Sequence, residues 1–219
     1  MRLSMMADAR GPFVVAHASD ALIDLSIAAP ELPRDIIPLL GLHDAINSAV
    51  SRADSRSHVA ARSARYLPLV PRPGKVICAG LNYRDHAAES GFALPTYPAL
   101  FARFSTSLIG HGQPIVRPRS SEQLDFEGEI AVIIGRFGRH VTRSEALGLV
   151  AGYSLFNDAS IRDFQMISSQ WTVGKNFDDT GAFGPDLVSA DELPPGLLVP
   201  LHSGFDRLAP NRARSGKLG

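Results

Sequence analysis

Residues 127–135, EGEIAVIIG, carry the clearest strand pattern in the chain, and they open with two carboxylates. Side chains two residues apart on a strand point to the same face, so Glu127 and Glu129 project side by side, about 7 Å apart. Carboxylates placed in this way repel each other unless a cation or a shared proton offsets their charge. Hard cations such as Mg²⁺ favour such oxygen ligands. The alternative is an amphipathic strand whose acidic edge faces solvent.

Another acidic side chain stands where a second expected strand ends. YSLFND (153–158) reads as a strand, and ASIRDFQ after it predicts the start of a helix. On that helix Asp158, Arg162 and Gln165 would fall at i, i+4 and i+7 on one face, directed towards one pocket. The alternative is that Asp158 caps the helix and forms a surface ion pair with Arg162.

A histidine and a glutamate follow the buried-strand pattern KVICAG (75–80), within the polar segment NYRDHAAES (82–90). His86 and Glu89 lie at i and i+3, close enough on a helix to form a pair. Glu89 would orient the imidazole and raise its basicity, so that His86 acts as a general base near neutral pH. The alternative is an exposed histidine on a polar helix.

A glycine precedes the lysine of the segment WTVGKNFD (171–178). This indicates a tight turn that presents the Lys175 ammonium, which suits a substrate carboxylate or enolate oxygen. A single Gly-Lys pair is common and says little by itself. The chain has no GxGxxG, GxxxxGK[ST] or GxSxG pattern, so nucleotide binding and serine hydrolysis lack their usual motifs.

The balance of charge excludes some classes of partner. There are 22 Lys+Arg and 22 Asp+Glu, whereas nucleic-acid binding needs a basic excess. The sequence shows no basic amphipathic helix, which would suggest binding to a membrane surface. It also has no apolar run approaching the roughly 18–20 residues of a membrane span. Cys78 is the only cysteine, which excludes an internal disulfide and a Cys-rich zinc site. The opening residues do not read as a signal peptide, so we expect a cytoplasmic protein.

We expect three regions along the chain. Residues 1–70 form a small N-terminal lobe, with two short strands around a turn in 13–26 and a helix over 43–53. The proline-rich stretch LPLVPRPGK (67–75) links this lobe to a catalytic domain over 71–196. Residues 197–219 show neither alternation nor a helical face, and we expect a disordered tail.

A helix is also expected over TRSEALGLVAG (142–152), between the two acidic strands. Thr142 or Ser144 would be its N-cap and Gly152 its end.

The motifs resemble, in order and separation, those of the fumarylacetoacetate hydrolase family. The matching stretches are GLNYRDHAAE (80–89), DFEGEIAVIIG (125–135), NDASIRDFQ (157–165), GKNFD (174–178) and Gly184-Pro185. The resemblance covers about residues 74–192. It implies a mainly β (α+β) fold, with rolled and mostly antiparallel sheets around a central pocket, and it suggests a homodimer.

The resemblance also implies one Mg²⁺, with Mn²⁺ or Ca²⁺ as substitutes, and a small 2-oxo acid as substrate. The implied metal ligands are Glu127, Glu129 and Asp158, the catalytic residues are His86, Glu89 and Lys175, and the substrate-binding residues are Arg162 and Gln165. A divalent ion would remove the repulsion among three carboxylates and polarise the chelated substrate.

The implied activity is hydrolysis or C–C cleavage of acylpyruvate-type acids through a metal-stabilised enolate. One alternative is an isomerase or decarboxylase of hydroxymuconate-type diacids in aromatic catabolism. Family members continue beyond the Gly-Pro pair through further strands, which the residues after Pro195 do not resemble. We therefore expect a fold that is incomplete at its C-terminus, and a second alternative is a truncated, inactive family member.

Overall fold

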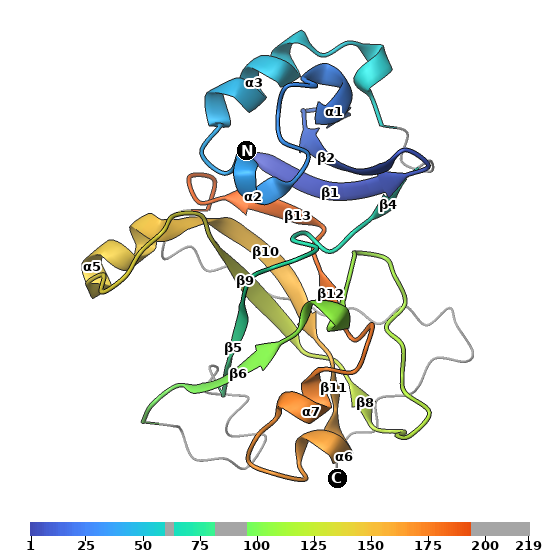
Figure 1. Cartoon of the computed structure of the whole chain (residues 1–219), viewed down its shortest axis with the longest axis vertical. Coiled ribbons are helices and arrows are strands. Elements are labelled where there is room, and N and C mark those ends of the chain that lie inside the picture. Colours follow the sequence, from blue (N-terminus) through green and yellow to red (C-terminus); the bar gives the residue numbers. More distant parts are fainter. Residues whose placement is uncertain (60–63, 82–95, 194–219) are drawn as a thin grey trace.

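The computed structural model describes residues 1–59, 64–81 and 96–193, and strands dominate it (Figure 1). The strands are β1 (Arg2–Asp8), β2 (Gly11–His17), β3 (Leu22–Asp24), β4 (Arg65–Tyr66), β5 (Val76–Gly80), β6 (Ala99–Arg103), β7 (Leu108–Ile109), β8 (Leu124–Asp125), β9 (Gly128–Ile134), β10 (Val150–Asp158), β11 (Ser160–Ile161), β12 (Gly181–Phe183) and β13 (Asp186–Ser189). The helices are α1 (Leu25–Ala28), α2 (Ile36–Leu39), α3 (His43–Arg52), α5 (Arg143–Ala146), α6 (Arg162–Gln165) and α7 (Thr172–Lys175), with 3₁₀ turns η1 (Ser55–Ser57), η2 (Ser105–Ser107) and η3 (Leu147–Leu149).

One large sheet organises these elements. Its strand order is β3-β2-β1-β13-β10-β12-β7, with β4 added on β1 and β9 added on β10. Only the pairing of β12 with β7 is parallel among the described strands. Two smaller pairs, β5 with β6 and β8 with β11, complete the arrangement. The prediction of a mainly β, mostly antiparallel fold is therefore confirmed.

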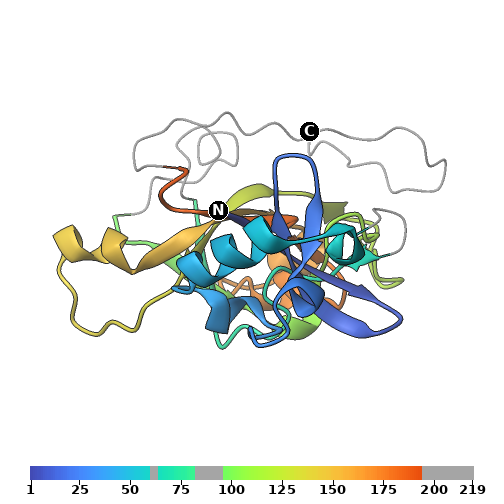
Figure 2. The same cartoon turned by 90° about the horizontal axis from the view of Figure 1, so that it is seen from above.

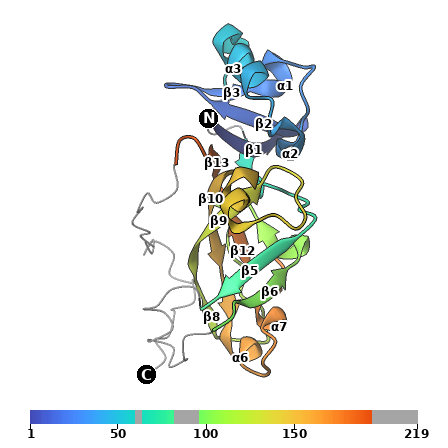
Figure 3. The same cartoon turned by 90° about the vertical axis from the view of Figure 1, so that its left-hand side faces the viewer.

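The N-terminal lobe follows the sequence pattern in part. The two strands expected in 13–26 are β2 and β3, which meet across a turn in which the Ala18 N–H donates to the Ala21 carbonyl, and α3 forms where helical spacing predicted it. A further strand that was not predicted, β1, pairs with β2. Ile46 and Ala49 of α3 are buried in the core, because these apolar positions lie on one face of the helix. Figures 2 and 3 show the lobe from above and from the side.

The sheet and the core both run across the boundary expected at residue 70. β1 pairs with β13, and Leu3 of β1 lies in the same core cluster as Phe156 and Leu187. Within the linker, the Leu69 N–H donates to the Phe183 carbonyl. The division into 1–70 and 71–196 stays a prediction, but the two parts share one sheet. The expected tail, 197–219, lies outside the described residues.

The prediction of a helix over 142–152 is wrong in its length, because α5 covers only Arg143–Ala146. Thr142 is its N-cap, with its backbone N–H and its hydroxyl donating to the Glu145 carboxylate at 2.9 and 2.7 Å. β10 already begins at Val150, so Gly152 lies in a strand rather than ending a helix. A Cβ at Gly152 would lie 2.3 Å from the Val188 carbonyl oxygen, so glycine is needed for the close approach of β13.

In the described part of the chain, no helix has the length and apolarity to cross a membrane.

A partly buried polar cluster joins the lobe to the rest of the sheet through β1, β2 and β13. The Ser4 hydroxyl donates to Asp186 Oδ1 at 2.6 Å and lies 2.7 Å from His17 Nε2, which is itself 3.1 Å from Asp186 Oδ1. Burial acts to raise the pKa of Asp186, but the hydrogen bonds from His17 and Ser4 outweigh it and hold that pKa below the ordinary value of 3.8. The ionised carboxylate therefore stabilises the junction.

We expect Asp186→Asn to lower the free energy of unfolding by about 1–2 kcal/mol at neutral pH, because a charged acceptor is lost. A pKa depressed in the folded state contributes stability above the ordinary aspartate value, and this is lost as the pH falls through the folded value. The difference from wild type should therefore shrink below about pH 4. Urea unfolding at several pH values measures it, with Asp20→Asn in the exposed turn as the control. An equal difference at all pH values would contradict the assignment.

Candidate functional site

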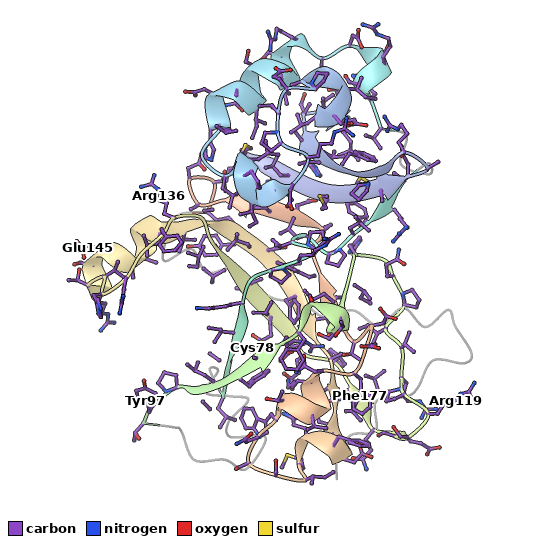
Figure 4. The ribbon with its side chains drawn as sticks, in the orientation of Figure 1. Cys78, Tyr97, Arg119, Arg136, Glu145 and Phe177 are labelled. Atoms are coloured by element: carbon purple, nitrogen blue, oxygen red, sulfur yellow. The ribbon has the colours of Figure 1, made fainter. Side chains whose placement is uncertain are left out.

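A pocket of about 2410 Å³ lies among β5, β6, β9, the end of β10, α6 and α7. The predicted site residues within the described part of the chain all line it: Glu127, Glu129, Asp158, Arg162, Gln165 and Lys175. Its volume exceeds the roughly 300–1,000 Å³ of ordinary small-ligand sites. Residues from both faces of β9 line it, so the cavity extends around that strand. Figure 4 labels Cys78, another lining residue, near the middle of the view, with Arg119 and Glu145 at opposite edges of the molecule.

Asp158 occupies the last position of β10, and both of its carboxylate oxygens are engaged. Its backbone N–H donates to the Glu127 carbonyl, which brings the two acidic segments together. Oδ1 accepts from Arg103 Nη1 at 2.5 Å, and Oδ2 accepts from Lys175 Nζ at 2.7 Å. The side chain is 4% exposed, so its charge depends on these two cations.

Glu127 lies directly before β9 and accepts from two cationic side chains. Oε2 accepts from Lys175 Nζ at 2.6 Å, and Oε1 accepts from Arg162 Nη1 at 2.5 Å. Burial acts to raise the pKa of Glu127, but the charges of Lys175 and Arg162 outweigh it and hold that pKa below its ordinary value. The carboxyl group is therefore ionised at neutral pH.

Lys175 ends the single helical turn α7 and is one of the most buried side chains in the described structure, at 1% exposure. Its ammonium lies between Glu127 and Asp158 and 5.0 Å from the centre of the Phe101 ring. Gly174 allows the Lys175 ammonium to reach this position, because a Cβ on residue 174 would lie 2.4 Å from the backbone nitrogen of Gln165. The glycine allows α7 to pack closely on α6, and the tight turn expected at this position is a single helical turn.

Arg162 and Gln165 come from α6 and face the same cluster. Arg162 Nη1 donates to Gln165 Oε1 at 2.8 Å, and its Nε and Nη2 both donate to Asp125 Oδ2. Burial acts to lower the pKa of Arg162, but Glu127 and Asp125 outweigh it and raise that pKa above its ordinary value. The guanidinium is therefore a permanent cation on the wall of the pocket.

The expected helical face of Asp158, Arg162 and Gln165 is wrong in its details. Asp158 ends a strand, and β11 follows it, paired with β8, before α6 begins at Arg162. The ion pair expected as an alternative, between Asp158 and Arg162, does not form either, since Arg162 pairs with Asp125 and Glu127. The short strand β11, paired with β8, takes the place of the expected first helical turn. The side chains of Asp158, Arg162 and Gln165 nevertheless all line the pocket.

The predicted metal ligands are brought together in part. Glu127 and Asp158 converge on one cationic atom, whereas Glu129 lies opposite Phe156 on the same sheet and has other interactions. Among the residues described, no three His, Cys, Asp or Glu side chains form a ready metal-holding group. The oxygen donors nevertheless suit a hard cation, because two carboxylates already share a positive charge and Glu129 lines the same pocket.

His86 and Glu89, the predicted general base and its partner, lie outside the described residues, so their roles stay predictions.

Several residues that shape the site were not predicted from the sequence. Arg103 at the end of β6 is buried against Asp158, and its only sequence signal was a lone basic residue at the end of a strand pattern. Trp171 packs edge-on against Phe101, and a Cβ on Gly80 would lie 2.1 Å from its ring. Burial and then the charge of Asp158 raise the pKa of Cys78 to about 12, so this thiol is not a nucleophile at neutral pH.

A family model described as fumarylacetoacetate (FAA) hydrolase C-terminal matches residues 75–203. Among curated proteins, the chain is 36% identical over 185 residues to "Oxaloacetate tautomerase Fahd2a, mitochondrial" of Rattus norvegicus, covering 78% of this chain and 56% of that protein. The chain thus spans little more than half the length of that relative.

Solved structures share the fold. A putative HpcE protein from Mycobacterium smegmatis superposes with a TM-score of 0.72 at 31% identity, covering 89% of this chain and 68% of that one. A maleylpyruvate hydrolase from Sphingobium, solved with manganese(II) and pyruvate, superposes with a TM-score of 0.70 at 24% identity, covering 89% and 69%. At that identity the second likeness concerns the fold alone.

We expect Lys175→Met to lower the free energy of unfolding by about 3–5 kcal/mol at neutral pH, because it leaves two buried carboxylates with one cation fewer. Without the ammonium, the pKa of Glu127 should rise, so the deficit should shrink as the pH falls and the carboxyl group becomes protonated. Urea unfolding at a series of pH values measures this. The control is Arg56→Met, which breaks an exposed pair with Asp54 and should change nothing measurable. A small deficit, or one that grows towards acid pH, would refute this account of the cluster.

Proposed function

Because this chain belongs to the fumarylacetoacetate hydrolase family, we propose that it is a divalent-metal-dependent hydrolase or C–C lyase of small 2-oxo acids of the acylpyruvate type. One observation carries the proposal. Carboxylates from two distant segments, Glu127 and Asp158, meet at one buried cation inside a pocket that also presents a guanidinium and an amide. Bringing these ions together in a buried site costs free energy, because each ion loses its hydration, and this cost favours a functional role for the cluster.

The cluster is suited to binding an anionic substrate together with a metal ion. Three carboxylates, those of Asp125, Glu127 and Asp158, are matched by the cations of Arg103, Arg162 and Lys175, so the group is neutral as it stands. A divalent cation adds two positive charges, which the carboxylate of a 2-oxo acid and that of Glu129 would offset. Under this proposal Glu127, Glu129 and Asp158 hold Mg²⁺, and Mn²⁺ or Ca²⁺ could replace it. The bound ion would supply Lewis-acid polarisation of the substrate carbonyl.

The other residues have distinct tasks in this proposal. The ammonium of Lys175 stabilises negative charge on the enolate form of the substrate, because it is buried where a charge interaction is strong. Arg162 and Gln165, held together by their own hydrogen bond, bind the substrate's polar groups. His86, oriented by Glu89, removes a proton from the attacking water.

A second candidate is the isomerase or decarboxylase reaction, in which the same enolate forms by loss of a proton or of CO₂. The relative named as an oxaloacetate tautomerase favours it, because tautomerisation of a 2-oxo diacid is a proton shift through the enol. Both candidates use the same pocket, so substrate turnover must separate them.

We expect turnover of at least one compound when an acylpyruvate, oxaloacetate and an unsaturated diacid are assayed side by side. Chelation should abolish the activity, and Mg²⁺ or Mn²⁺ should restore it. Glu127→Gln should reduce kcat/KM by at least about 10²-fold, because one charged ligand is lost. Glu31→Gln on the exposed surface is the matched control and should retain activity.

The substrate that is consumed distinguishes the two candidates. Product formation from the acylpyruvate alone supports the hydrolase, and from the diacids alone the isomerase or decarboxylase. Metal-independent turnover would overturn the proposal. No turnover of any compound by a folded chain would favour the inactive alternative.

A further inference from the structure

We propose that Arg103 is a positioning residue that fixes the Asp158 carboxylate so that one oxygen, Oδ2, faces the pocket. Arg103 touches none of the reacting groups in the proposed function; it acts through Asp158. The inference rests on the proposed function, because it concerns a predicted metal ligand.

The guanidinium of Arg103 is fully enclosed and contacts four residues from three parts of the chain. Nη1 donates to Asp158 Oδ1 at 2.5 Å and to the Ala159 carbonyl at 3.2 Å. Nη2 donates to Thr180 Oγ1 at 2.9 Å, and Nε donates to Ser107 Oγ at 3.3 Å. These partners come from the end of β10, the approach to β12 and the turn after β6. All three guanidinium nitrogens thus donate hydrogen bonds, and their acceptors lie in different parts of the chain, which fixes the orientation of the guanidinium.

The two oxygens of Asp158 are consequently not equivalent. Oδ1 is held by Arg103 on the protein side, whereas Oδ2 accepts from Lys175, which lines the pocket. Rotation of the carboxylate would break the contact with Arg103, whose side chain is fully buried, while Asp158 is only 4% exposed. The geometry therefore presents a single oxygen, in a fixed direction, to a cation in the pocket.

An arginine is required here for its shape as well as its charge. A planar fork can satisfy Asp158, Ala159 and Thr180 at once, whereas the ammonium of a lysine is a single point. The surroundings are fitted to the fork as well. A Cβ on Gly181 would lie 2.9 Å from Nη2, and the Phe156 ring lies 5.4 Å from the guanidinium carbon.

Mn²⁺ affinity separates positioning from two simpler roles. If Arg103 only contributes charge, Arg103→Lys should bind Mn²⁺ as wild type does, and Arg103→Gln should bind it more tightly because a repelling cation is removed. If Arg103 only supports the fold, any loss of affinity should follow the loss of stability. Under our proposal both variants bind Mn²⁺ about 10–100-fold more weakly, as is usual when the partner of a metal ligand is removed.

The experiment is a Mn²⁺ titration of the whole chain, following the electron paramagnetic resonance signal of the free ion, with melting curves on the same samples. Asp186→Asn is the matched control, because it breaks a partly buried polar cluster that does not line the pocket and should lower the melting temperature without changing Mn²⁺ affinity. Gly181→Ala is a second probe, which crowds Nη2 but keeps Arg103 and should weaken Mn²⁺ binding several-fold.

Each outcome decides the matter. Wild-type affinity in Arg103→Lys, or tighter binding in Arg103→Gln, would overturn the proposal, as would an equal loss of affinity in Asp186→Asn. If neither Arg103 variant folds, Gly181→Ala decides, and unchanged affinity there also rejects it. If wild type itself does not bind Mn²⁺, the metal-dependent function fails, which is a different result from variants that match a binding-competent wild type.

Discussion

The buried ammonium of Lys175 is the contact on which the pocket depends. It lies between two carboxylates whose mutual repulsion would otherwise push the start of β9 and the end of β10 apart. Neighbouring residues position these groups. Gly174 lets α7, which carries Lys175, approach α6, and Arg103 binds the other oxygen of Asp158. Six ionised groups balance here, from the fully buried Arg103 to the partly exposed Asp125, so the removal of any one affects its neighbours.

Much of this arrangement was accessible from local sequence patterns. Alternation along 127–135 predicted a strand, and β9 covers Gly128–Ile134. Glu127 lies just before that strand, and both Glu127 and Glu129 line the pocket. The position of Asp158 at a strand end was also correct. Amphipathic spacing identified α3, and the mainly β class followed from the resemblance. These features depend on neighbours within a few residues, which the sequence displays directly.

The features that were missed or mistaken depend on contacts distant in the chain. Arg103 and Asp158 are separated by 55 residues, and nothing local to Arg103 indicates a carboxylate. The segment after Asp158 looked helical because β11 is only two residues long and is stabilised by β8 rather than by its own pattern. Gly152 was predicted to end a helix, whereas glycine is required there because β13 packs directly against its backbone.

The position of β13 has a consequence for how this fold can be divided. β13 pairs with β1 of the N-terminal lobe along one edge and with β10, which ends at Asp158, along the other. A catalytic unit cut out at the linker would lose the strand beside β13 and expose backbone donors and acceptors where Leu3 and Leu187 now pack. Transplanting the pocket into another protein would therefore require β1 to travel with it.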